Sequence, residues 1–134
     1  MPATASPPAP ARHVAVLPYD LHAPAVARRI AERWLKATEP ADHVDDAVLV
    51  VSELVTNAVR HTHDSCRLTL TVEEGHLDIA VADHSEDLPD MRVHTSGDER
   101  GGFGMDIVCQ LGGQVTVVPA IGGKTVHVLL ELES

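Results

Sequence analysis

The feature that most constrains the fold is a pair of alternating segments joined by a short turn. Residues 66–72 place apolar side chains at every second position, with basic or hydroxyl side chains between them, and this is the period of a strand with one buried face. Glu74-Gly75 then supplies a hairpin turn, and residues 77–81 repeat the alternation. The expected inward residues are Leu68, Leu70, Val72, Leu77, Ile79 and Val81.

Further apolar segments extend this hairpin into a sheet with helices. Hairpin-linked strands are typical of antiparallel sheets. The order of elements therefore predicts an α+β fold, a two-layer α/β sandwich whose mixed, mostly antiparallel sheet has its helices on one face. Strands are expected at 12–17, 115–118 and 125–132, helices at 25–37, 42–61 and 103–111, and a long polar loop at 83–102.

The length and charge of the chain limit its organisation and its function. The 134 residues suffice for one domain. Residues 1–11, rich in Pro and Ala, are expected to form a disordered tail before a folded domain at 12–134. Ten basic against twenty acidic residues give a net charge of −10, which argues against direct nucleic-acid binding. The sequence has no apolar run long enough for a membrane span and no signal core, so a cytoplasmic protein is expected.

The helix expected at 25–37 is amphipathic. Its inward side is assigned to Val26, Ile30, Trp34 and Leu35. Its other side faces either solvent or a protein partner, and it carries Arg28, Arg29, Glu32, Arg33 and Lys36.

The helix expected at 42–61 carries the most informative polar line of the chain. Glu53 and Asn57 are four residues apart and lie on one helix face. Leu49 and Val50 border this line and are expected to cover it partly, as in the wall of a pocket. A solvated polar face is the alternative, since many amphipathic helices carry one. The opposite, core-facing side is assigned to Val44, Ala47, Val48, Val51, Leu54, Val55 and Ala58.

Three later motifs carry further candidate residues. Asp83 ends a strand, where its carboxylate can accept a hydrogen bond from a ligand amine or simply cap a loop. The glycines at 101, 102 and 104 run into an apolar helix, where backbone amides favour anions, or else punctuate a flexible loop. The segment Gly122-Gly123-Lys124-Thr125 lacks the upstream glycine of a P-loop. A hairpin turn with one exposed lysine is the simpler interpretation.

Taken in order, these motifs resemble those of the GHKL superfamily over residues 12–132. Glu53 and Asn57 match its N box within Glu-Leu-Val-Thr-Asn-Ala, and Asp83 matches its adenine-binding acidic residue. The resemblance implies the Bergerat ATP-binding fold. The single-domain length and the segment at 50–61 look like the anti-sigma-factor serine kinases of actinobacteria. The remaining matches are Gly102 and Gly104 in the glycine-rich lid of the superfamily, and Gly123, Lys124 and Thr125 in the Gly-Lys-Thr motif near its C-terminal end.

The resemblance implies ATP and Mg²⁺ as ligands and a protein serine/threonine kinase activity. Asn57 would hold the Mg²⁺, and Asp83 would bind the adenine amino group with support from Thr125. Glu53 would act as general base toward a serine hydroxyl. The implied partners are a sigma factor and an anti-sigma-factor antagonist, and the oligomeric state stays open, a homodimer included. The lid residues that would contact the nucleotide are Gly102, Gly104 and Met105.

The same fold could instead serve as a non-catalytic module that binds a regulatory partner with or without nucleotide. The segment 83–87 lacks both glycines of the superfamily's Asp-x-Gly-x-Gly, which favours this alternative. The retained Glu53 favours the kinase, because binding alone needs no base.

Overall fold

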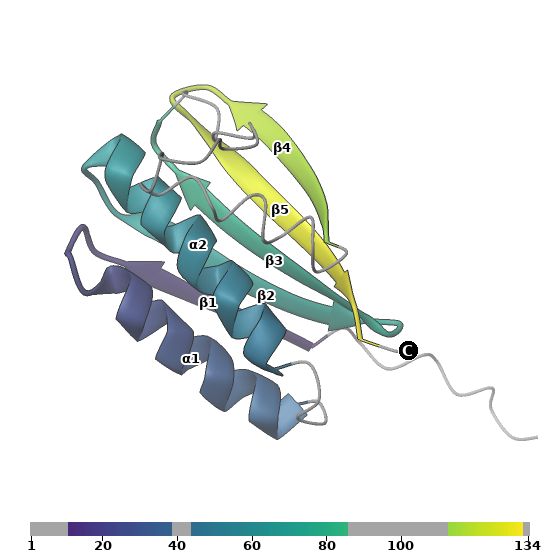
Figure 1. Ribbon diagram of the computed structural model, residues 1–134. Coiled ribbons are helices and arrows are strands. Elements are labelled where there is room, and N and C mark those ends of the chain that lie inside the picture. The colour runs from purple at the N-terminus through teal and green to yellow at the C-terminus, as the bar shows by residue number, and fades with distance from the viewer. Residues whose placement is uncertain (1–10, 39–43, 86–112, 133–134) are drawn as a thin grey trace, which may run out of the picture.

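The computed structural model describes residues 11–38, 44–85 and 113–132, and these form two layers (Figure 1). The five strands make one sheet in the order β1-β2-β3-β5-β4, with every neighbouring pair antiparallel. Both helices lie on one face of that sheet (Figure 1). The predicted two-layer α+β sandwich is confirmed. The elements are β1 (Ala11–Leu17), α1 (Ala23–Thr38), α2 (Val44–Thr62), β2 (Cys66–Glu73), β3 (His76–Asp83), β4 (Gln114–Ala120) and β5 (Gly123–Glu131).

The β2–β3 hairpin forms as the alternating residues predict. Glu74 and Gly75 both adopt positive φ angles, 53° and 78°, which is the backbone that two-residue hairpin turns require. All six expected inward side chains are buried. Except for the small Ala80, the residues between them are partly or fully exposed. The sheet therefore has one face packed under the helices and one face that the described residues leave uncovered.

Helix α1 packs through small residues, and this corrects one expectation. Its buried positions are Ala23, Ala27, Ala31 and Leu35, at four-residue spacing. Val26, expected to face inward, is 45% exposed. Alanine side chains let two helices approach closely, so α1 is turned toward its alanine stripe against α2 rather than toward Val26.

Helix α2 lies beside α1 on the same face of the sheet (Figure 1), and it contacts α1, β2, β3 and β5. Apolar residues therefore cover more of its circumference than in a helix that packs against one neighbour. Val50, expected to border the polar line, is fully buried at 0% exposure, whereas Leu49 is 38% exposed. The C-terminal half of α2 lies beside the end of β3 and the start of β5 (Figure 1). This arrangement positions the candidate site.

Some expectations fall on residues outside the described ranges. They are residues 1–10 of the tail expected at 1–11, the part of the long loop after Ser85, and the short helix at 103–111. Ala11, the last residue of the expected tail, begins β1. Neither α1 nor α2, the helices of the described ranges, is long and apolar enough to span a bilayer.

Candidate functional site

The C-terminal half of α2, which carries Glu53 and Asn57, lies beside the end of β3 (Figure 1). Glu53 and Asn57 are both partly buried there, and α2 packs directly on β3. The Asn57 carboxamide makes no hydrogen bond to another side chain of the described residues. Its oxygen can therefore bind a ligand without first breaking a contact within this part of the chain.

Glu53 sits in an environment that strengthens it as a base. Burial raises the pKa of its carboxyl group above 4.5, and the positive charge of Arg60 opposes part of this rise. Loss of hydration disfavours a carboxylate, so the ionised form binds a proton more tightly than a surface glutamate does. The geometry of the helix thus places a strengthened base one turn from a carboxamide that has no side-chain partner among the described residues.

Asp83 closes β3 and is buried at the strand end. Its Oδ1 atom accepts a hydrogen bond of 2.9 Å from the backbone N–H of Ser85. This local bond is the loop-capping role that the sequence left as one alternative. It uses only part of the carboxylate, which can accept about four hydrogen bonds.

Lys124 supplies the other partner of Asp83. Its Nζ atom donates to Oδ1 at 3.1 Å and to Oδ2 at 3.0 Å, and both side chains are only 3% exposed. The expectation of an exposed lysine in this hairpin turn is therefore wrong. Lys124 lies opposite Asp83 in the β3–β5 register, and opposite residues on paired strands project to the same face.

Gly123 makes this pairing geometrically possible. A Cβ atom built at this position would overlap the backbone carbonyl oxygen of Asp83. Gly122, the preceding turn residue, has a φ of 77°, a conformation that glycine adopts freely. The two glycines thus let β5 begin in close contact with the end of β3.

Thr125, a candidate support for Asp83, lies on the other side of the sheet. It is opposite Ala82 in the register, and both residues line a broad hollow on the uncovered face. Successive residues of a strand point to opposite faces. The side chain in register with Asp83 is therefore Lys124, not Thr125.

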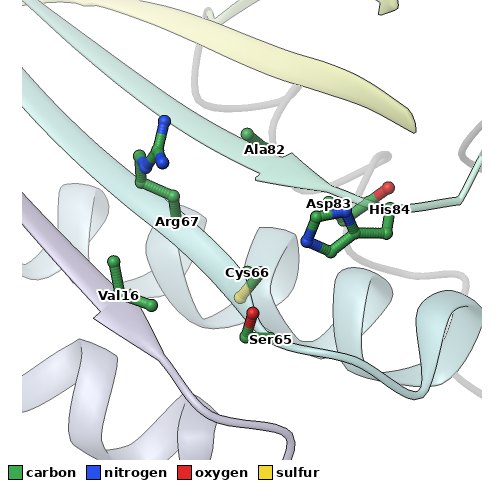
Figure 2. Close-up of a pocket in the computed structure, with 7 residues that line it drawn as sticks. All are labelled: Val16, Ser65, Cys66, Arg67, Ala82, Asp83 and His84. Carbon is green, nitrogen blue, oxygen red and sulfur yellow. The ribbon is translucent and has the colours of Figure 1, made fainter. Parts of the chain in front are cut away.

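A small pocket of about 130 Å³ opens at the ends of β1, β2 and β3. Figure 2 shows Asp83 and His84 at its rim, with Cys66 beneath them. Burial and the nearby Asp83 charge raise the pKa of the Cys66 thiol to about 11. Cys66 thus stays a protonated, weakly reactive thiol at neutral pH.

The lid candidates Gly102, Gly104 and Met105 lie outside the described residues. The described part of the site consists of Glu53 and Asn57 on α2 and of Asp83 with Lys124 at the strand end. Of the predicted residues, the fold brings these α2 and β3 positions to neighbouring elements, and it places Thr125 on the opposite face.

The sequence of the chain decides its family. Residues 17–129 match the model of the histidine kinase-like ATPase domain. The chain belongs to this family. It is therefore a GHKL-superfamily domain, as its motifs predict. No curated protein matches the chain significantly in sequence.

Solved structures with this domain share the fold. The blue-light-activated histidine kinase of Erythrobacter litoralis EL346 is similar with a TM-score of 0.54 and 21% identity, over 78% of this chain and 40% of that one. The Acinetobacter baumannii histidine kinase AdeS has a TM-score of 0.51 and 14% identity, over 91% and 68%. The histidine kinase domain of the E. coli osmosensor EnvZ has a TM-score of 0.50 and 15% identity, over 99% and 94%.

These likenesses concern the ATPase domain rather than whole kinases. The chain spans 40% of the Erythrobacter kinase and 61% of its histidine kinase domain. At identities of 14–21% the comparison supports the fold alone.

Proposed function

We propose that this GHKL domain binds ATP with Mg²⁺ and transfers the γ-phosphoryl group to a serine of an anti-sigma-factor antagonist. The observation that carries the proposal is the arrangement on α2. A carboxylate strengthened by burial lies one helical turn from a carboxamide without a side-chain partner in the described residues. Phosphoryl transfer needs positioning and charge neutralisation together with a group that receives the hydroxyl proton.

Asn57 fits the role of a Mg²⁺ ligand. Mg²⁺ prefers oxygen ligands and is usually held by one or two protein groups together with phosphates and water. The partly buried carboxamide offers one such oxygen. When bound, Mg²⁺ supplies positive charge that stabilises the transferring phosphoryl group.

Glu53 acts as the general base in this proposal. It takes the proton of the serine hydroxyl while the serine oxygen bonds to the γ-phosphorus and the bond from phosphorus to the ADP oxygen breaks. A pKa raised by desolvation favours proton acceptance, provided that the pH lies above that pKa. The superfamily match assigns Asp83 to the adenine amino group, and Gly102, Gly104 and Met105 are the proposed lid.

The proposed protein partners are a sigma factor, which the domain would sequester, and the antagonist that it would phosphorylate. The exposed side of α1 supplies a candidate contact surface. It carries Arg28, Arg29, Arg33 and Lys36, and clustered positive charge favours an acidic partner surface.

A second candidate function has its own observation in support. The buried Asp83–Lys124 ion pair joins two strand ends without any ligand. This favours a non-catalytic module that holds a regulatory protein with or without nucleotide.

Calorimetric titration of ATP with Mg²⁺ into the wild type and Asn57→Ala tests the leading proposal. We expect the wild type to bind and the variant to lose Mg²⁺-dependent binding while keeping its circular dichroism spectrum, because Asn57 lies off the buried face of α2. Thr56→Ala, a partly buried neighbour on the same helix, is the matched control. Equal affinity in Asn57→Ala and the wild type would remove Asn57 from the site.

A further inference from the structure

The Asp83–Lys124 pair is complete in itself. Besides its two contacts with the carboxylate, the Lys124 Nζ atom donates to the backbone oxygen of Ser85 at 3.3 Å. An ammonium group has three N–H donors, and these three contacts account for them. Lys124 therefore has no donor left over for a ligand.

The backbone holds this pair in place. Asp83 and Lys124 occupy opposite positions in the β3–β5 register, and Gly123 lets the two strand ends approach closely. Both side chains are 3% exposed. The Asp83 carboxylate already accepts three hydrogen bonds, one from Ser85 and two from Lys124, of the about four that a carboxylate can accept. A ligand must therefore compete with Lys124 for most of this carboxylate.

We propose that Lys124 is a specificity-determining residue that withholds the Asp83 carboxylate from the nucleotide base, so that the domain binds purine nucleotides without preference for the adenine amino group. This inference rests on the proposed binding of a nucleotide with Mg²⁺, and it removes Asp83 from the contact with the amino group that the superfamily match implies. The nucleotide is held instead by its phosphates and Mg²⁺, at the Asn57 end of the site.

The relative strengths of the two interactions support this outcome. Lys124 brings a full positive charge and two hydrogen bonds to the carboxylate, whereas the amino group of the base is neutral and brings hydrogen bonds alone. Displacing Lys124 would also leave a buried ammonium without its counter-ion, which is strongly unfavourable. The base amino group therefore cannot displace the lysine at a net gain.

The test compares two nucleotides and three forms of the protein by calorimetry. The affinity for ATP with Mg²⁺ is compared with that for purine riboside triphosphate with Mg²⁺. This analogue differs from ATP only in lacking the amino group of the base. Lys124→Thr removes the ammonium and leaves room for water or the base beside Asp83. Arg12→Ala, at an exposed cation of β1 outside the candidate site, is the matched control.

We expect the wild type and Arg12→Ala to bind the two nucleotides with affinities within about threefold of each other. Lys124→Thr should bind ATP about tenfold more tightly than the wild type, the effect of one hydrogen bond to a charged group. Its affinity for the analogue should stay unchanged. A merely structural role for Lys124 predicts weaker, not tighter, binding in the variant.

Two results would overturn the inference while leaving the proposed function intact. They are a wild-type preference for ATP of about tenfold or more, and a folded Lys124→Thr that gains no affinity for ATP. If Lys124→Thr does not fold, the wild-type comparison of the two nucleotides decides alone. If neither form binds either nucleotide, the proposed function itself fails, and the inference fails with it.

Discussion

The two ends of the candidate site differ in how their polar groups are satisfied. On α2, Glu53 and Asn57 are partly buried, and the carboxamide has no side-chain partner in the described residues. At the strand end, Asp83 and Lys124 are almost fully buried and bonded to each other. The α2 end can receive a ligand at once, whereas the strand end must first lose an ion pair. A residue that matches a ligand-binding motif is thus not always open to a ligand.

The largest effect is expected at the α2 end. Glu53→Gln should lower the rate of phosphoryl transfer about 10²–10⁴-fold, because an amide cannot accept the serine proton. Its affinity for ATP should be retained. The assay follows transfer from γ-phosphate-labelled ATP to a purified anti-sigma-factor antagonist, with calorimetry for binding.

Glu73→Gln, at an exposed position of β2, is the matched control for loss of a negative charge and should transfer at the wild-type rate. If Glu53→Gln also transfers at that rate, the α2 end has no base and Glu53 is structural.

At the strand end the expected effect is on stability. Asp83→Ala should lower the free energy of unfolding by about 3–5 kcal/mol, because it leaves the Lys124 ammonium buried without its counter-ion. Urea unfolding followed by circular dichroism measures this. The matched control is Glu32→Ala, which breaks the Lys36–Glu32 pair, whose side chains are 58% and 48% exposed. That change should cost only about 0.3–0.5 kcal/mol.

Equal losses in these two variants would mean that the buried pair contributes no more than a surface pair. The contrast between the two ends of the site would then lose its energetic basis.

Much of the fold was predictable because it depends on local patterns. The alternation at 66–72 and 77–81, together with the Glu74-Gly75 turn, specifies the β2–β3 hairpin. The four-residue spacing of Glu53 and Asn57 places them on one face of α2. These features depend on residues close together in the sequence, so they can be predicted from a single sequence.

The misassigned residues depend on contacts that are distant in sequence. Val26 points outward because α1 packs its alanine stripe on α2. Val50 is buried because α2 has neighbours on two sides. Lys124 is buried because β5 pairs with β3, although β4 intervenes along the chain. The sequence signal for the burial of Lys124 is the neighbouring Gly123. This signal can be interpreted only once the strand order is known.

The smallest expected effect is a pH dependence of stability that comes from the α2 end alone. The pKa of Glu53 is raised above 4.5 in the folded chain, chiefly by burial. Folding therefore favours the protonated form. The stability that this group contributes is fully present below the unfolded pKa and is lost as the pH rises through the folded pKa. Glutamine stays neutral throughout.

Urea unfolding of the wild type and Glu53→Gln between about pH 4 and about pH 8 tests this sign. We expect Glu53→Gln to gain stability relative to the wild type as the pH rises from 4.5 upward, and the difference to level off above the folded pKa. Glu73→Gln controls for the general effect of removing one negative charge from an acidic protein. A difference between Glu53→Gln and the wild type that stays constant with pH, or that shrinks as the pH rises, would show that burial does not disfavour the Glu53 carboxylate. The α2 end would then lack the strengthened base on which the kinase proposal depends.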